Sequence, residues 1–216
     1  MKKILNAIAG IFALLILPMV LSAQQTTAPT PARDTTSKIK VESSVTGEYF
    51  LRDDHYVQRL TENVRLRQDS TLVLCDIAVI DRDNATLSGN VVIQQGDSLK
   101  VFADSAFYNG TTREADLYGN VVLVNGRQEL FTSRLHYDMA NKIATYHQGA
   151  TLTNGQSQLT STHGYYHVKE KQVYFKGHVL VTDPEFTMRT DTMSFNTETQ
   201  LVQFLAPTLI SQRGSK

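Results

Sequence analysis

A short apolar motif returns about every 29 residues along most of this chain, and the repeat constrains the fold more than any other feature. Successive copies are separated by 27, 30, 29, 29 and 29 residues. The copies begin at Leu60, Leu87, Leu117, Tyr146, Phe175 and Phe204. A fixed period of roughly 20 to 50 residues is typical of stacked repeat units. Each copy is therefore expected to be one element of a repeat architecture whose neighbours bury a common core.

Within each copy, apolar residues alternate with polar ones, which is the pattern of a β-strand with one face buried. The first and seventh columns are apolar in every copy, and the fifth is mostly valine. The third column is small in four copies, with Gly89, Gly119, Gly177 and Ala206. We interpret this column as one that leaves width inside the fold.

A second extended motif follows each of the first five copies, at steps of 28, 29, 29 and 29 residues. An apolar column and then a small one, which includes Cys75, share one face of this strand. Five residues after the small column stands a column of aromatic residues or Ile. An odd spacing puts these side chains on the other face of a regular strand. Asp76, Asp104 and Asp191 lie between the two columns. A parity change within one strand requires a bulge or bend, so the strand is expected to bend near these aspartates, whose carboxylates accept bonds that stabilise the corner.

Turn signals such as Asn-Gly at residues 109–110 and 125–126 join these strands, and strands joined by tight turns pair antiparallel. The predicted fold is all-β: an antiparallel stack of about eleven strands, built from double-strand repeats of about 29 residues. No helical periodicity is found after residue 40.

The chain ends differ in composition from the repeats. Residues 1–23 carry Lys2 and Lys3, an apolar run over 4–20 and small residues before Gln24, which is the order of a cleaved secretory signal. Residues 24–38 are rich in Thr and Pro and are expected to form a flexible leader. The repeat domain is then expected over 39–212, with a tail at 213–216. Retention of residues 4–20 as a membrane anchor is the alternative to cleavage.

Charge and composition exclude several classes of function. Lys and Arg number 21, as do Asp and Glu, and no basic block is present, so nucleic acid is not an expected partner. Cys75 is the single cysteine, which excludes an internal disulfide and a cysteine-based zinc site. Five of the six histidines lie between residues 136 and 178, but their columns do not converge, so no metal site is predicted. No catalytic constellation is found, and neither an enzyme nor a cofactor is expected.

The motif A-x-L-x-G-N-V at 85–91 and 115–121, followed by A-D-x-A-x-Y-N at 103–109, resembles the OstA/LptA-like family over residues 41–212. The resemblance implies an open β-jellyroll, or β-taco, and a periplasmic carrier of lipopolysaccharide related to LptC and the N-terminal domain of LptD. It implies that lipid A acyl chains are held in an apolar trough. It also implies that edge strands near 41–66 and 201–211 pair head to tail with Lpt-type proteins between the two membranes, or with further copies of this chain. The sequence departs from the motif at Gln148-Gly149 and at Ala206-Pro207, so the later repeats are expected to be less regular.

Strand parity assigns the lining of that trough. The predicted lipid-binding residues are Leu87, Val91, Ile93, Val101, Leu117, Val121, Leu123, Leu130, Leu152, Leu159, Phe175, Val179, Val181 and Met188.

Three other interpretations stay open at this point. The column of Tyr108, Tyr137, Tyr166 and Phe195 is compatible with a β-solenoid that stacks on glycans. The same repeats are compatible with a scaffold whose interior is filled by side chains. An LptC-like component anchored through residues 4–20 is the alternative within the family.

Overall fold

The computed structural model describes residues 38–96, 99–199 and 201–212. The predicted signal peptide, the leader up to residue 37 and the tail lie outside the described residues. All regular structure in the described part of the chain is β, and its strands form one antiparallel sheet of sixteen strands. The prediction of an all-β antiparallel repeat stack is confirmed.

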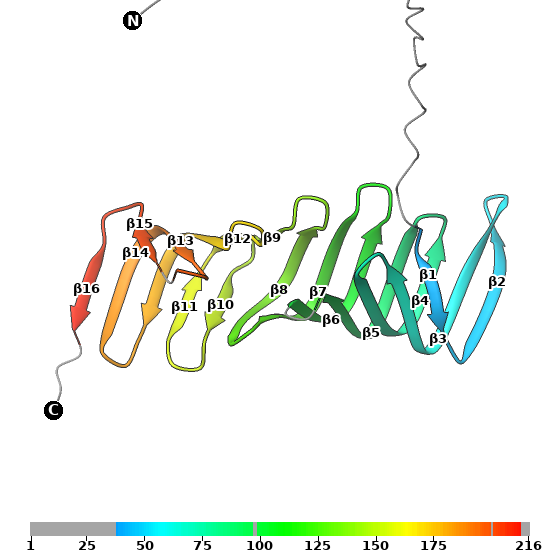
Figure 1. The fold of residues 1–216 in the computed structure, drawn as a ribbon, viewed down its shortest axis with the longest axis horizontal. Helices are drawn as coiled ribbons and strands as arrows, with labels where there is room; N and C mark the ends of the chain where they lie inside the picture. Colours follow the sequence, from blue (N-terminus) through cyan, green and yellow to red (C-terminus); the bar gives the residue numbers. More distant parts are fainter. Residues whose placement is uncertain (1–37, 97–98, 200, 213–216) are drawn as a thin grey trace, which may run out of the picture. The chain divides into compact units, whose positions relative to one another are not determined.

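The strands follow one another along the sheet almost in sequence order, from β2 at one end to β16 at the other (Figure 1). The first eight are β1 (Lys40–Ser43), β2 (Thr46–Arg52), β3 (His55–Gln68), β4 (Thr71–Asp81), β5 (Asn84–Gln95), β6 (Leu99–Asn109), β7 (Glu114–Asn125) and β8 (Gln128–Asp138). The others are β9 (Ile143–Tyr146), β10 (Ala150–Thr153), β11 (Gln158–Ser161), β12 (His163–His167), β13 (Gln172–Thr182), β14 (Phe186–Asn196), β15 (Val202–Phe204) and β16 (Leu209–Gln212).

The described strands outnumber the expected eleven because several repeat strands are broken in two. β9 and β10 lie end to end along β8, and β15 and β16 do so along β14. These breaks fall at Gln148-Gly149 and Ala206-Pro207, where the sequence departs from the motif. β11 and β12 are separated at Thr162, a break that the sequence did not predict.

The long strands bend where two residues of one strand face one residue of the next. In β5, Gly89 and Asn90 both have positive φ and face Asp104 of β6, and the register shifts there. Asp104 Oδ2 accepts bonds of 3.1 Å from the backbone and side-chain nitrogens of Asn120 in β7. The bend near the aspartates is therefore confirmed, although the extra residue of the bulge belongs to the Gly-Asn strand.

The glycine column has a different role from the one expected. Gly119 has φ 96°, and a Cβ placed there would lie 2.6 Å from the Cβ of Asp104. Gly119 itself is exposed rather than interior. Gly89 and Gly119 each permit the left-handed backbone of the bulge and the close approach of an aspartate, and Gly177 has the same backbone beside Thr162. The prediction that these glycines widen the interior is therefore wrong.

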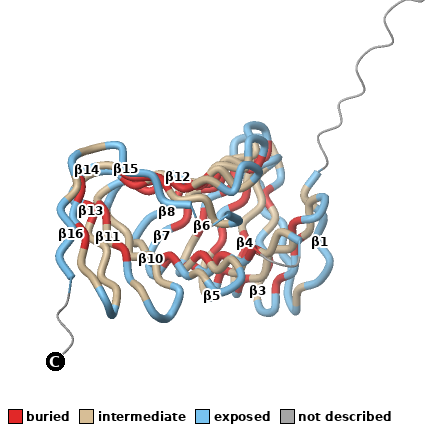
Figure 2. Tube along the Cα trace, turned by 60° about the vertical axis from the view of Figure 1, so that its left-hand side comes forward, coloured by how far each residue is buried: buried red, intermediate tan, exposed pale blue. Residues whose placement is uncertain are grey.

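Each bent strand contributes one half to an upper layer and the other half to a lower layer. The upper row of turns joins the strands at the top of Figure 1, and the lower row joins them at the bottom. Buried residues lie along both layers (Figure 2), and their apolar side chains form a single cluster from Leu60 to Met193. The layers meet at the bulges, and we call the opposite side, where the two rows of turns face each other, the mouth.

One end of the sheet has a narrower edge than predicted, and the other end lies close to its predicted place. β1 and β2 lie along β3, so residues 55–66 of β3 are covered and the edge is formed by residues 40–52. The other edge is formed by β15 and β16, near the predicted 201–211. At both edges large apolar side chains are exposed, among them Tyr49, Leu51, Leu209 and Ile210.

Candidate functional site between the two layers

All of the residues predicted to line a trough lie on the inner side of the two layers. Twelve of the fourteen are buried, at 8% exposure or less, and Leu152 and Val181 are partly buried and pack against the same cluster. Strand parity thus assigns which side chains point inward. It does not determine whether space is left between them.

The interior is filled over the first half of the sheet. Leu87, Val91, Leu117 and Val121 from β5 and β7 are each 2% exposed or less. A small cavity of about 30 Å³ lies beside this part of the core and is lined by Leu66, Ile93 and Tyr108. A second one of about 30 Å³ lies at the middle of the sheet, beside Leu123, Leu130 and Tyr166. A volume of this size holds about one water molecule.

The second half contains a larger apolar cavity of about 210 Å³. Its lining comes from β8, β10, β11, β13, β14, β15 and the turn after β10. It includes Leu152, Leu159, Val181 and Met188 from the predicted set. Phe186, Met193, Phe195 and Val202 complete its apolar lining. Four of the fourteen predicted residues therefore surround this apolar space between the layers.

A polar cleft of about 760 Å³ adjoins this cavity at the mouth. Residues of the lower turns, Arg127, Gln128 and Asn154 among them, form one side, and Lys171 and Glu198 of the upper turns form the other. Gln128 and Asn154 line both the cleft and the apolar cavity. The space between the layers thus changes from apolar to polar toward the solvent.

Tyrosines of β6, β8 and β12 bridge the mouth at three places, the last of them at the border of the cleft. The Tyr108 hydroxyl donates to Gln68 Oε1, and the Tyr137 hydroxyl donates to Gln95 Oε1 at 2.5 Å. The Tyr166 hydroxyl accepts a 2.9 Å bond from Asn125 Nδ2. Each bond joins the upper end of one strand to the lower end of another, 40 to 42 residues earlier in the chain. We call these three contacts the tyrosine bridges.

Sequence reasoning singled out the tyrosines but missed their partners. The amides form a column of their own, because Gln68, Gln95, Asn125 and Asn154 follow the seventh column by two residues in successive copies. That signal was present in the 29-residue period. Tyr108, Tyr137 and Tyr166 are 3% to 8% exposed, so their rings are not available to stack on a glycan.

Burial makes two of the interior tyrosines weaker acids than a free tyrosine. It raises the pKa of Tyr137 to about 12, with smaller contributions from Asp138 and Tyr166. Burial also raises the pKa of Tyr146 to about 12, against the effect of its 2.5 Å bond with Ser161 Oγ. Both hydroxyls therefore keep their protons at neutral pH and remain able to donate.

We expect these two tyrosines to make the fold sensitive to alkali. A phenol whose pKa is raised by folding binds its proton more tightly in the folded state, so its stability contribution is complete below pH 10 and is lost as the pH rises from about 10 to about 12. Each residue contributes up to about 2–3 kcal/mol. Urea unfolding at pH 9, 10, 11 and 12 measures the loss. Tyr137→Phe should lose less stability over that interval than the wild type, and an equal loss would contradict the assignment.

The other candidate residues have structural positions. Burial, together with the neighbouring Asp76, raises the pKa of the Cys75 thiol to about 11, so a thiolate nucleophile is not favoured there. Asp76 accepts a 2.8 Å bond from Asn90 Nδ2, and Asp191 accepts a bond from Thr192 Oγ1. Among the described residues no three His, Cys, Asp or Glu side chains converge on a point that could hold a metal ion. The described residues also include no helix with the length and hydropathy of a membrane span.

Comparison with known proteins identifies the family to which a chain with this geometry belongs. A family model described as OstA-like protein matches residues 36–191, which include the bulged strands, the tyrosine bridges and most of the cavity lining. The chain belongs to the OstA-like family. The predicted resemblance is therefore confirmed at the level of the family.

The sequence was also compared with curated proteins, and the fold with solved structures. No curated protein matches this sequence. Among solved structures, the chain is similar to LptH of Pseudomonas aeruginosa, described as the LptA-homologous periplasmic component of the lipopolysaccharide transport device. The identity is 18%, the TM-score is 0.45, and the match covers 55% of this OstA-like chain and 95% of LptH.

Proposed function

We propose that this OstA-like protein is a non-enzymatic periplasmic carrier of lipopolysaccharide. It holds lipid A acyl chains between its two layers and leaves the sugar-phosphate head at the mouth. The observation that carries the proposal is the apolar cavity of about 210 Å³ that adjoins a polar cleft of about 760 Å³. An amphipathic ligand requires this sequence of environments, because its chains gain about 0.8 kcal/mol for each CH₂ group removed from water while its head remains solvated.

The exposed edges support a role in a larger assembly. Among the described strands, β2 pairs with β3 alone and β16 with β14 alone, and both carry exposed apolar side chains. An open sheet edge is a template for strand addition. We propose that Lpt-type modules, or further copies of this chain, extend the sheet at these edges and link the inner and outer membranes. Family membership supports the same partners.

Lipid binding is tested by native mass spectrometry of the protein mixed with lipid A. Leu152→Glu places a charge in the apolar cavity, and we expect it to reduce the lipid adduct at least about tenfold, because a carboxylate in an apolar site is strongly unfavourable. Thr151→Glu is the matched control: the preceding residue of β10 pairs with Phe131 and Thr160, whereas Leu152 pairs with Leu130 and Leu159.

The wild type and the Thr151→Glu variant should give one or a few lipid adducts at micromolar lipid, with circular dichroism confirming that all three proteins are folded. Absence of any adduct in the wild type would reject the carrier function. Equal adducts in all three proteins would reject the cavity as the binding site.

A further inference from the structure

The tyrosine bridges form a series that stops before the apolar cavity. The bridged pairs are Gln68 with Tyr108, Gln95 with Tyr137 and Asn125 with Tyr166, and the separation within each pair is 40 to 42 residues. The aromatic column continues to Phe195, and the residue 41 positions earlier is Asn154, the next member of the amide column. Asn154 and Phe195 both line the cavity of about 210 Å³. They therefore occupy the fourth position of the series.

Phe195 has no hydroxyl, so this position cannot form the bond that the tyrosines form. The Asn154 side-chain oxygen instead accepts bonds of 3.0 and 2.9 Å from the backbone nitrogens of Gln156 and Ser157 in its own turn. The cavity volumes differ in the same way between the bridged positions and the fourth position. Beside the bridges they measure about 30 Å³, and at Asn154 and Phe195 the cavity measures about 210 Å³.

The two layers must move apart to admit a lipid. A dry apolar cavity on the order of 150 Å³ holds a molecule the size of benzene, so the space between the layers accepts only part of an acyl chain as it stands. Separation at the first three positions breaks bonds made by tyrosines that are 3% to 8% exposed. Phe195 can make no such bond to Asn154, and the bonds of 3.0 and 2.9 Å that the Asn154 side-chain oxygen accepts stay within its own turn.

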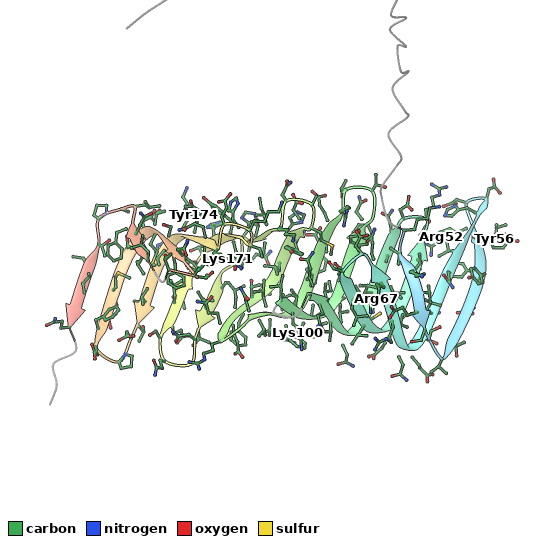
Figure 3. All side chains as sticks on the ribbon, in the orientation of Figure 1. Arg52, Tyr56, Arg67, Lys100, Lys171 and Tyr174 are labelled. Carbon is green, nitrogen blue, oxygen red and sulfur yellow. The ribbon has the colours of Figure 1, made fainter. Side chains whose placement is uncertain are left out.

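The cleft outside this position carries charges of the sign that a phosphorylated head requires. Arg127 lies on the lower side and Lys171, labelled in Figure 3, on the upper side. Both are exposed, and Glu198 is the acidic residue of the same cleft. A lipid whose head is held by these two cations has its chains directed at the opening between Asn154 and Phe195.

We propose that the lipid enters sideways through the mouth at Asn154 and Phe195, and that the three tyrosine bridges keep the rest of the mouth shut. This inference rests on the proposed lipid-carrier function and adds the place of entry. The class of ligand is an acylated lipid with an anionic sugar-phosphate head.

The test measures the rate at which lipid A passes from micelles into the protein, followed as a time course by native mass spectrometry. Phe195→Tyr supplies a hydroxyl to which the Asn154 amide can donate, as Asn125 donates to Tyr166, and we expect it to slow uptake about tenfold while the final adduct stays within twofold of wild type. Tyr166→Phe removes the adjoining bridge and should speed uptake several-fold. Phe131→Tyr makes the same chemical change on the exposed face of β8, outside the cavity lining, and is the matched control, with an expected change of less than twofold.

The outcomes separate the two proposals. If the wild type takes up no lipid A, the carrier function itself is rejected. If the wild type takes up lipid and Phe195→Tyr does so at the same rate, only the place of entry is rejected. Equal slowing by Phe131→Tyr also rejects it, because the effect then does not depend on a contact with Asn154. A final adduct that falls in step with the rate would assign Phe195 to binding and reject its role in entry.

Discussion

Phe175→Ala is expected to lower the free energy of unfolding by about 3–5 kcal/mol, the largest effect of any single substitution considered for this protein. Phe175 lies in β13, is 0% exposed, and pairs with Gly164 of β12 and Met193 of β14. The neighbouring backbone is held at fixed spacing by those pairings, so the space left by the ring cannot collapse. Urea unfolding followed by circular dichroism measures the loss.

The matched control is the preceding residue, Tyr174, which lies on the opposite face of the same strand. Tyr174, labelled in Figure 3, stacks on Tyr165 with ring centroids 4.7 Å apart and is only partly buried. Tyr174→Ala should cost about 1 kcal/mol, which is the usual contribution of an aromatic pair at a surface. Similar losses for the two variants would mean that strand parity has been assigned to the wrong faces.

Gly119→Ala is expected to destabilise the fold by about 3 kcal/mol for two additive reasons. A φ of 96° is unfavourable for any residue with a Cβ, and the new methyl would lie 2.6 Å from the Cβ of Asp104 and closer still to its carboxylate. The aspartate cannot withdraw without losing its bonds to Asn120. The substitution therefore strains the bend that joins the two layers.

Gly126→Ala measures the backbone part of this effect alone, so the difference between the two variants gives the steric part. Gly126 also has a positive φ, of 64°, but a Cβ there would meet nothing within 4 Å. The control should cost about 1 kcal/mol, the ordinary penalty of a left-handed residue other than glycine. Thermal unfolding of both variants gives the comparison. Equal costs would show that the close approach of Asp104 has no energetic consequence.

Several features of the fold could be predicted from the sequence because they depend on local patterning. The 29-residue period and the alternation of apolar residues predicted extended strands, the turn residues predicted antiparallel pairing, and the parity change beside Asp104 predicted a bend. The departures at Gln148-Gly149 and Ala206-Pro207 coincide with breaks between strands. Each of these inferences concerns residues that are neighbours in the chain or successive members of one column.

The interior could be predicted only in part. Parity assigned Val91, Leu117 and Leu152 to the same inner side, but it contains no information on the distance between two facing layers. Tertiary packing decided that Val91 and Leu117 lie in a filled core while Leu152 borders a cavity. The role of Gly119 was misread for a related reason, because a positive φ and an approaching carboxylate are visible only when adjacent strands are in register.

The sequence by itself determined the strands, their bends and the side chains that face inward, since these follow from covalent geometry and the hydrophobic pattern. The tertiary structure decided which residues meet across the mouth. Tyr137 and Gln95 are 42 residues apart, a separation that is not a multiple of the repeat, because it depends on how the two layers fold over each other. The amide column and the aromatic column are both present in the sequence. Only the three-dimensional fold shows that they form hydrogen bonds with each other across the mouth.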